Sequence, residues 1–163
     1  MSNTPKITEC PAFDVIGISV RTNNATEATG AGAIPQQWAR FFQESVMGKI
    51  PNRADDTVYA VYSDYQKDRN GDYDFTLGVR VTDSSTVAPG MVVKHIPAGK
   101  YSVVTSDKGP AHQVIPAAWQ EVWKLEDGSR LGGIRSYNSD FEVYDDRSRD
   151  PDNVQVDIHV GVK

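Results

Sequence analysis

The sequence predicts an α+β domain built from two consecutive βαββ units, and three observations lead to this fold class. The chain has 163 residues, of which 39% are hydrophobic and 24% charged, as in a globular domain with a buried core. Apolar residues recur at helical spacing in two separate segments. Around these segments, the order strand, helix, strand, strand occurs twice. The alternative is a plain α+β domain whose halves are alike by coincidence.

The first unit is expected over residues 13–85, behind an N-terminal extension of residues 1–12. Its predicted elements are, in chain order, strand 13–20, a loop or helix approach at 22–32, helix 33–47, strand 57–65 and strand 73–81. The first strand is rich in β-branched residues. The helix tolerates Pro35 in its first turn and is stopped by Gly48. The Asn-Gly pair at 70–71 favours a hairpin between the last two strands.

The second unit is expected over residues 86–163, so that a single domain spans residues 1–163. Its predicted elements are, in order, strands 91–96 and 100–106, helix 111–125, strand 140–144 and strand 154–162. The segment Pro97–Gly99 forms a turn between the first two strands. The helix has an apolar face and ends at the Asp-Gly pair at 127–128. Together the units predict antiparallel sheets with two main helices on one face.

Charge and composition narrow the class of function. Asp and Glu number 22 against 17 for Lys and Arg, a net charge of −5, which argues against direct nucleic-acid binding because that requires a basic surface. The single cysteine, Cys10, cannot form an intramolecular disulfide, and no apolar run is long enough for a membrane span. No motif typical of a metal or cofactor site is present. We therefore expect a cytoplasmic protein without metal or cofactor.

Three segments have a distinctive order and spacing. They are Tyr73–Val79; Met91–Tyr101 with Gly109–Pro110 and Ile115–Trp123; and Asp140–Asp145 followed by Val156–Val160. The most specific parts are Ile-Pro-Ala-Gly-Lys-Tyr at 96–101 and Phe-Glu-Val-Tyr at 141–144. From about residue 13 to the C-terminus, this pattern resembles the GyrI-like, or AraC-type effector-binding, domain family.

The resemblance implies a duplicated βαββ fold with a pseudo-twofold axis and a pocket between the halves. In many members, this pocket binds hydrophobic organic cations through an acidic side chain among aromatic residues. Some members carry a DNA-binding head and activate transcription, whereas some stand-alone members are similar to gyrase inhibitors or to hydrolases of cyclopropane-bearing compounds. Because few residues precede its first predicted strand, this chain is expected to be a stand-alone member. It departs from the family pattern at His159 and Gly161, where members often have an aromatic residue and a proline.

Glu142 is the residue to which the resemblance assigns cation recognition. Alternation along its strand places Glu142 and Tyr144 on one face and Phe141 and Val143 on the other. From the residues alone, Glu142 could face either solvent or a cavity. In an apolar cavity its carboxylate would lack a countercharge, which a bound organic cation would supply, and aromatic walls would add cation–π attraction.

The other candidate ligand-binding residues are aromatic or lie in the last strand. The aromatic candidates are Trp38, Tyr59, Trp119, Tyr137 and Tyr144. Trp38 and Trp119 occupy equivalent positions on the apolar faces of the two helices, so each could equally be a core residue. Asp157 and His159 share one face of the last strand, where Glu142 could be their neighbour. They could form an acid–base pair or a structural hydrogen bond.

Three functional hypotheses follow. The leading one is a binding protein that captures hydrophobic cationic small molecules, such as drugs or dyes, and serves in drug sensing or transcription regulation. The second is a hydrolase of strained electrophilic compounds, in which Glu142 or the Asp157–His159 pair activates water. The third is an interaction protein that inhibits a target such as gyrase. We favour a binding protein over an enzyme, and the sequence predicts neither the natural ligand nor the oligomeric state.

Overall fold

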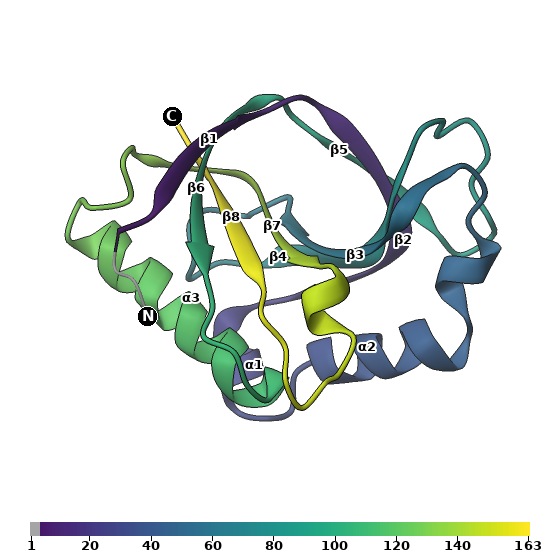
Figure 1. Ribbon diagram of the computed structural model, residues 1–163, viewed down its shortest axis with the longest axis horizontal. Helices are drawn as coiled ribbons and strands as arrows, with labels where there is room; N and C mark the ends of the chain where they lie inside the picture. The colour runs from purple at the N-terminus through teal and green to yellow at the C-terminus, as the bar shows by residue number, and fades with distance from the viewer. Residues whose placement is uncertain (1–3) are drawn as a thin grey trace.

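The computed structural model describes residues 4–163, which form one eight-stranded antiparallel sheet and three α-helices (Figure 1). The strands are β1 (Lys6–Cys10), β2 (Phe13–Thr22), β3 (Arg53–Ser63), β4 (Tyr73–Val81), β5 (Val92–Ile96), β6 (Gly99–Thr105), β7 (Arg135–Tyr144) and β8 (Asp157–Val162). The helices are α1 (Asn24–Ala28), α2 (Ile34–Gln43) and α3 (Ala111–Asp127), with the 3₁₀ helices η1 (Val46–Lys49) and η2 (Asp146–Ser148). The α+β class is confirmed, although the strands join in one sheet rather than in separate sheets.

The strands lie in the order β1-β6-β8-β7-β3-β4-β2-β5. The order β3-β4-β2 in the first half therefore repeats as β7-β8-β6 in the second half, and the pairing of β3 with β7 joins the two. Strand β1 lies in the segment expected as an extension, residues 1–12, and adds an edge to the sheet by pairing with β6. Residues 1–3 of that segment lie outside the described residues. Strand β5 forms the opposite edge by pairing with β2.

Several boundaries differ from the sequence-based expectations. The polar segment expected as a loop or helix approach contains α1, which begins after the N-cap residue Asn23. The helix predicted at 33–47 ends at Gln43, because Ser45 adopts a left-handed backbone (φ 50°) and a 3₁₀ helix follows. Strand β7 begins at Arg135, earlier than expected. Its pairing with β8 is irregular between Arg135 and Asp140, and Tyr137 in this segment has a left-handed backbone (φ 55°). Strand β8 begins later than expected, after an isolated bridge.

The hydrophobic core is divided between the two faces of the sheet. Helices α2 and α3 cover one face (Figure 1) and bury the larger cluster, which includes Phe41, Leu77 and Trp119. The smaller cluster, on the opposite face, includes Val61 and Phe141. The helices and the sheet face beneath them therefore enclose most of the interior.

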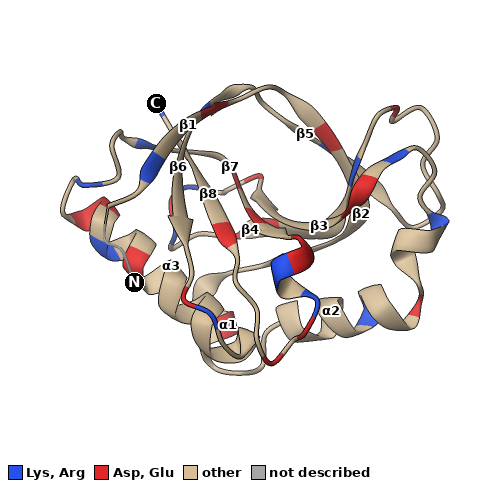
Figure 2. Ribbon diagram, viewed as in Figure 1, with Lys and Arg blue, Asp and Glu red and all other residues tan. Residues whose placement is uncertain are grey.

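Charged residues of both signs are spread over loops, helices and strands rather than gathered in one basic surface (Figure 2). Among residues 4–163, no helix is long and apolar enough to cross a membrane. The same residues provide no group of three or more His, Cys, Asp or Glu side chains placed to hold a metal ion. Two carboxylates stand apart from the others because they are buried, those of Asp140 and Glu142.

Candidate functional site

Glu142 lies in β7 on the face of the sheet that the helices cover. Its backbone is in register with Ala60 of β3 and Ile158 of β8, and the residue is 1% exposed. Its neighbours Phe141 and Val143 belong to the smaller cluster on the opposite face. The predicted alternation is therefore confirmed, and the environment of Glu142 is the interior rather than solvent.

Three neutral groups donate hydrogen bonds to the Glu142 carboxylate. The Tyr62 hydroxyl and Trp119 Nε1 donate to Oε2 at 2.8 and 2.6 Å, and the Tyr144 hydroxyl donates to Oε1 at 2.7 Å. Burial raises the pKa of Glu142, and the three hydrogen bonds, which lower it, do not offset this desolvation. No cationic side chain of the described residues contributes to that pKa. The carboxylate is thus a buried acidic group without a cationic partner.

Aromatic rings surround this carboxylate. The Tyr62 and Trp119 rings lie 4.9 Å apart, and the Trp38 and Tyr144 rings lie 4.7 Å apart, centroid to centroid. Burial raises the pKa of both tyrosines well above the ordinary value, so their hydroxyls keep the protons that they donate. Phe42 of α2 is 67% exposed, and its ring stacks on that of Trp38 at 6.0 Å between centroids.

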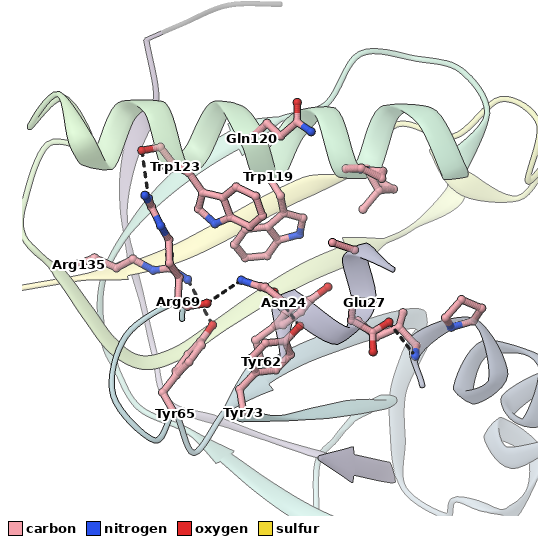
Figure 3. A pocket seen from close by; sticks show the side chains of 15 residues that line it. Asn24, Glu27, Tyr62, Tyr65, Arg69, Tyr73, Trp119, Gln120, Trp123 and Arg135 are labelled. Atoms are coloured by element: carbon pink, nitrogen blue, oxygen red, sulfur yellow. Dashed lines mark hydrogen bonds between the residues drawn. The ribbon is translucent and has the colours of Figure 1, made fainter. Parts of the chain in front are cut away.

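Two adjoining cavities lie between the helices and the sheet. The first, here called the carboxylate cavity, has a volume of about 510 Å³ and a wall that includes Trp38, Phe42, Glu142 and Tyr144. The second, here called the arginine cavity, has a volume of about 490 Å³ and a wall that includes Arg69, Trp119, Trp123 and Arg135 (Figure 3). Five residues line both cavities: Ile34, Pro35, Tyr62, Ile115 and Pro116. The shared wall places the two cavities side by side.

The arginine cavity ends in a network of charged side chains. Arg135 Nη2 donates to Asp140 at 2.7 Å, and Nη1 donates to Glu126 at 3.3 Å. Burial opposes the charge of Arg135, but Asp140 and its neighbours more than offset this, so the pKa of Arg135 lies above its ordinary value. Arg69, on the loop between β3 and β4, donates to the Trp123 carbonyl at 3.3 Å (Figure 3). It also pairs with Glu126. This network ties the loop and β7 to α3.

Four of the predicted ligand-binding residues lie outside both cavities. Tyr59 packs against Phe141 in the smaller cluster on the opposite face, at 5.9 Å between centroids. His159 stacks on the same phenylalanine at 4.5 Å, and Asp157 shares the face of His159 in β8. Tyr137 lies beside the arginine network, where its ring is 4.2 Å from the Arg135 guanidinium carbon.

The structure does not bring Glu142 together with Asp157 and His159, although these residues could have been neighbours across the sheet. Glu142 is in register with Ile158, and His159 with Phe141. Because side chains alternate along a strand, the Asp157 and His159 side chains point away from the Glu142 face. The carboxylate and the histidine therefore do not form one acid–base site.

Sequence reasoning missed Tyr62, Phe42 and Arg135 as residues of the site. Local sequence places Tyr62 in a strand, but its position beside Glu142 depends on the register between β3 and β7. A buried arginine leaves no distinct signal in a single sequence, because Arg is mostly exposed in proteins.

The fold and this site define the class of protein: an α+β effector-binding domain with a buried glutamate in an aromatic cluster. The family model described as "Cass2: Integron-associated effector binding protein" matches residues 6–162, and the chain belongs to this family. The expected relationship to GyrI-like effector-binding domains is thereby confirmed.

Relatives in sequence and structure agree with this assignment. YobU of Bacillus subtilis, which is named for transcriptional regulation, is 31% identical over 149 residues, covering 90% of each chain. The crystal structure of an integron cassette protein from the mobile metagenome of Vibrio cholerae has a TM-score of 0.77 and 28% identity, covering 98% of this chain and 96% of that one. The structure of SAV2435 bound to tetraphenylphosphonium has a TM-score of 0.78 and 18% identity, covering 100% and 94%, and shows the shared fold.

Proposed function

We propose that the carboxylate cavity binds hydrophobic cationic small molecules and that Glu142 supplies the countercharge. The observation that carries this proposal is the burial of the Glu142 carboxylate, whose three hydrogen-bond donors are all neutral. An unpaired buried charge is costly. A bulky cation with dispersed charge is weakly hydrated, so it can supply the missing charge at a small desolvation cost. Tetraphenylphosphonium, bound by SAV2435, is a cation of this kind and supports the proposal.

The aromatic walls supply the remaining affinity. Trp38, Tyr144 and Phe42 line the carboxylate cavity, and Trp119 holds the carboxylate from the adjoining cavity. Each good cation–π contact contributes roughly 0.5–2 kcal/mol. Since flat aromatic faces impose few directional bonds, we expect the site to accept cations of different shapes.

The proposed pocket lies where two duplicated halves meet, over residues 13–85 and 86–163 of one domain. The repeated strand order supports the duplication. The pairing of β3 with β7, and the hydrogen bond from Tyr62 to Glu142, support a pocket between the two halves. Trp38 on α2 and Trp119 on α3 are the corresponding helical residues. The naming of YobU for transcriptional regulation supports a role in sensing such ligands for gene control.

Charge selectivity tests the proposal directly. Tetraphenylphosphonium and tetraphenylborate have nearly the same shape and opposite charge. Isothermal titration calorimetry in a sodium buffer is expected to show saturable binding of the phosphonium and at least about tenfold weaker binding of the borate, a difference of about 1.4 kcal/mol. Equal affinity for the two ions would show that the cavity recognises shape and apolar surface rather than cationic charge.

Binding of a permanent cation is expected to weaken as the pH falls. The raised pKa of Glu142 means that the carboxylate takes up a proton above the usual range for glutamate, and the neutral acid no longer attracts the cation. Affinity for tetraphenylphosphonium should therefore be highest above this pKa and decline on acidification through it. The titration is made in a His112→Gln background, because His112 also lines this cavity. A pH-independent affinity would contradict the role of Glu142.

A further inference from the structure

The wall of the arginine cavity also carries a carboxylate, that of Glu27 on α1 (Figure 3). Its Oε2 accepts hydrogen bonds from the Thr22 hydroxyl at 2.5 Å and from the Ala33 backbone N–H at 2.8 Å, and its Oε1 accepts one from the Ile34 backbone N–H at 3.2 Å. These donors are all neutral. Among residues 4–163, no Lys, Arg or His side chain forms an ion pair with Glu27. Like Glu142, it is therefore an acidic group without a cationic partner.

The charge of Glu27 acts on the wall that the two cavities share. The residue is only partly buried, and its hydrogen-bond donor Ile34 lines both cavities. Burial raises the pKa of Tyr73, which also lines the arginine cavity, and the negative charges of Glu27 and Glu142 raise it further. The Tyr73 hydroxyl thus lies within the field of both carboxylates. A ligand in this part of the arginine cavity would lie within the same field.

The two arginines on the same wall do not cancel the charge of Glu27. Arg69 and Arg135 pair with three carboxylates, those of Glu126, Asp127 and Asp140. Their guanidinium charges are therefore matched within their own network. In the view of Figure 3, Arg69 and Arg135 lie on one side of the cavity and Glu27 on the other, with Tyr62 between them. The side of the cavity near Glu27 is thus the side that favours a cation.

We propose that the arginine cavity binds a second cationic group at Glu27, so that the two adjoining cavities together accept hydrophobic dications. This inference rests on the proposed cation site at Glu142, and it defines the ligand class further: two cationic ring systems joined by an apolar linker. A cation with dispersed charge needs no particular lone pair of the carboxylate. The three hydrogen bonds that Glu27 accepts can therefore remain in place when the second group binds.

The size and walls of the cavities suit such a ligand. Their volumes of about 490 and 510 Å³ both fall within the range of roughly 300–1,000 Å³ that is usual for ligand pockets. Each cavity can therefore hold one ring system, and the linker would run along the shared wall at Tyr62. The Trp119 and Trp123 rings line the arginine cavity, where they would add cation–π attraction to the charge of Glu27.

A dication and its own half test the second subsite. Dequalinium contains two aminoquinaldinium rings joined by an apolar chain, and the matched monocation is one such ring carrying a decyl chain. Isothermal titration calorimetry is expected to show about tenfold tighter binding of dequalinium, an effect between those of an exposed and a buried charge pair. Two equivalent ends alone would give a statistical advantage of only about twofold. An advantage of that size or smaller would overturn the inference.

Glu27→Gln assigns the advantage to the second carboxylate. Glutamine keeps an oxygen that can accept from Thr22 and Ala33 but carries no charge, so the ratio of the two affinities is expected to fall from about tenfold to about twofold. Glu44→Gln is the matched control, because it removes the charge of an exposed glutamate outside both cavities; it should keep the tenfold ratio. An equal fall of the ratio in both variants would contradict the inference, since general attraction by the acidic chain would then explain it.

A second variant keeps the test decisive if Glu27→Gln does not fold. Ala28 is exposed and lines the arginine cavity, so the ammonium group of Ala28→Lys should repel the second cationic group and lower the ratio. A tenfold ratio that persists in the folded variant contradicts the inference. The monocation separates the two proposals: its failure to bind the unmodified protein would refute the cation site at Glu142, whereas its binding as tightly as dequalinium would overturn only the second subsite.

Discussion

Replacement of Glu142 with glutamine is expected to weaken the binding of tetraphenylphosphonium by about 30-fold or more, the usual effect of removing one partner of a buried charge pair. The amide has nearly the shape of the carboxylate. Its oxygen can accept from Tyr62 and Trp119, and its nitrogen can donate to the Tyr144 hydroxyl. The variant therefore removes the charge while retaining the packing of the cavity. Isothermal titration calorimetry at neutral pH measures the loss.

The folding stability of Glu142→Gln shows whether weaker binding results from the lost charge or from unfolding of the variant. The folded-state pKa of Glu142 is raised, so the folded protein binds its proton more tightly than the unfolded chain does. Stability therefore falls as the pH rises from the unfolded pKa through the folded pKa. Glu142→Gln has no carboxylate to ionise in the interior, so this variant should be at least as stable as the parent protein at neutral pH. The matched control is Glu44→Gln, an exposed glutamate on α2's C-cap. Unchanged affinity in Glu142→Gln would refute the proposed site.

Replacement of Gly78 with alanine is expected to lower the free energy of unfolding by about 3 kcal/mol, the upper part of the usual range for overpacking a core. Gly78 of β4 is in register with Gly17 of β2. A Cβ on Gly78 would lie 2.1 Å from the Ile16 carbonyl oxygen, and a Cβ on Gly17 would lie 1.9 Å from the Leu77 carbonyl oxygen. Since both obstructing atoms belong to the backbone, relief requires the two strands to separate. Urea unfolding followed by circular dichroism measures the change.

Gly99→Ala is the matched control for this effect. Gly99 also lies in a strand, β6, but a Cβ there would meet no atom within 4 Å. The free energy of unfolding of Gly99→Ala should stay within about 1 kcal/mol of the parent value, since ordinary differences in strand propensity are of this size. Equal losses in the two variants would show that strand propensity, rather than the close approach of β2 and β4, explains the need for glycine at position 78.

The residues of the proposed cation site could be predicted only in part. Alternation along β7 correctly separated Glu142 and Tyr144 from Phe141, and helical spacing placed Trp38 and Trp119 on inward faces. Side chains also alternate along β3, but the alternation alone does not show which face of this strand the helices cover. The sequence favours Tyr59 as a candidate, whereas Tyr62, on the other face of the same strand, is the tyrosine of β3 that contacts Glu142.

The sequence by itself determined the α+β class, the family and the local periodicity, because these depend on patterns within short segments and on motifs in order. The tertiary structure decided which of these segments meet. Tyr62 and Glu142 are 80 residues apart in the chain, and Arg135 meets Trp119 only after β7 has packed beneath α3. A strand's backbone sets the alternation of its side chains, but the partner, register and buried face are set by distant segments. The buried charges at Glu142 and Arg135 are therefore properties of the folded chain.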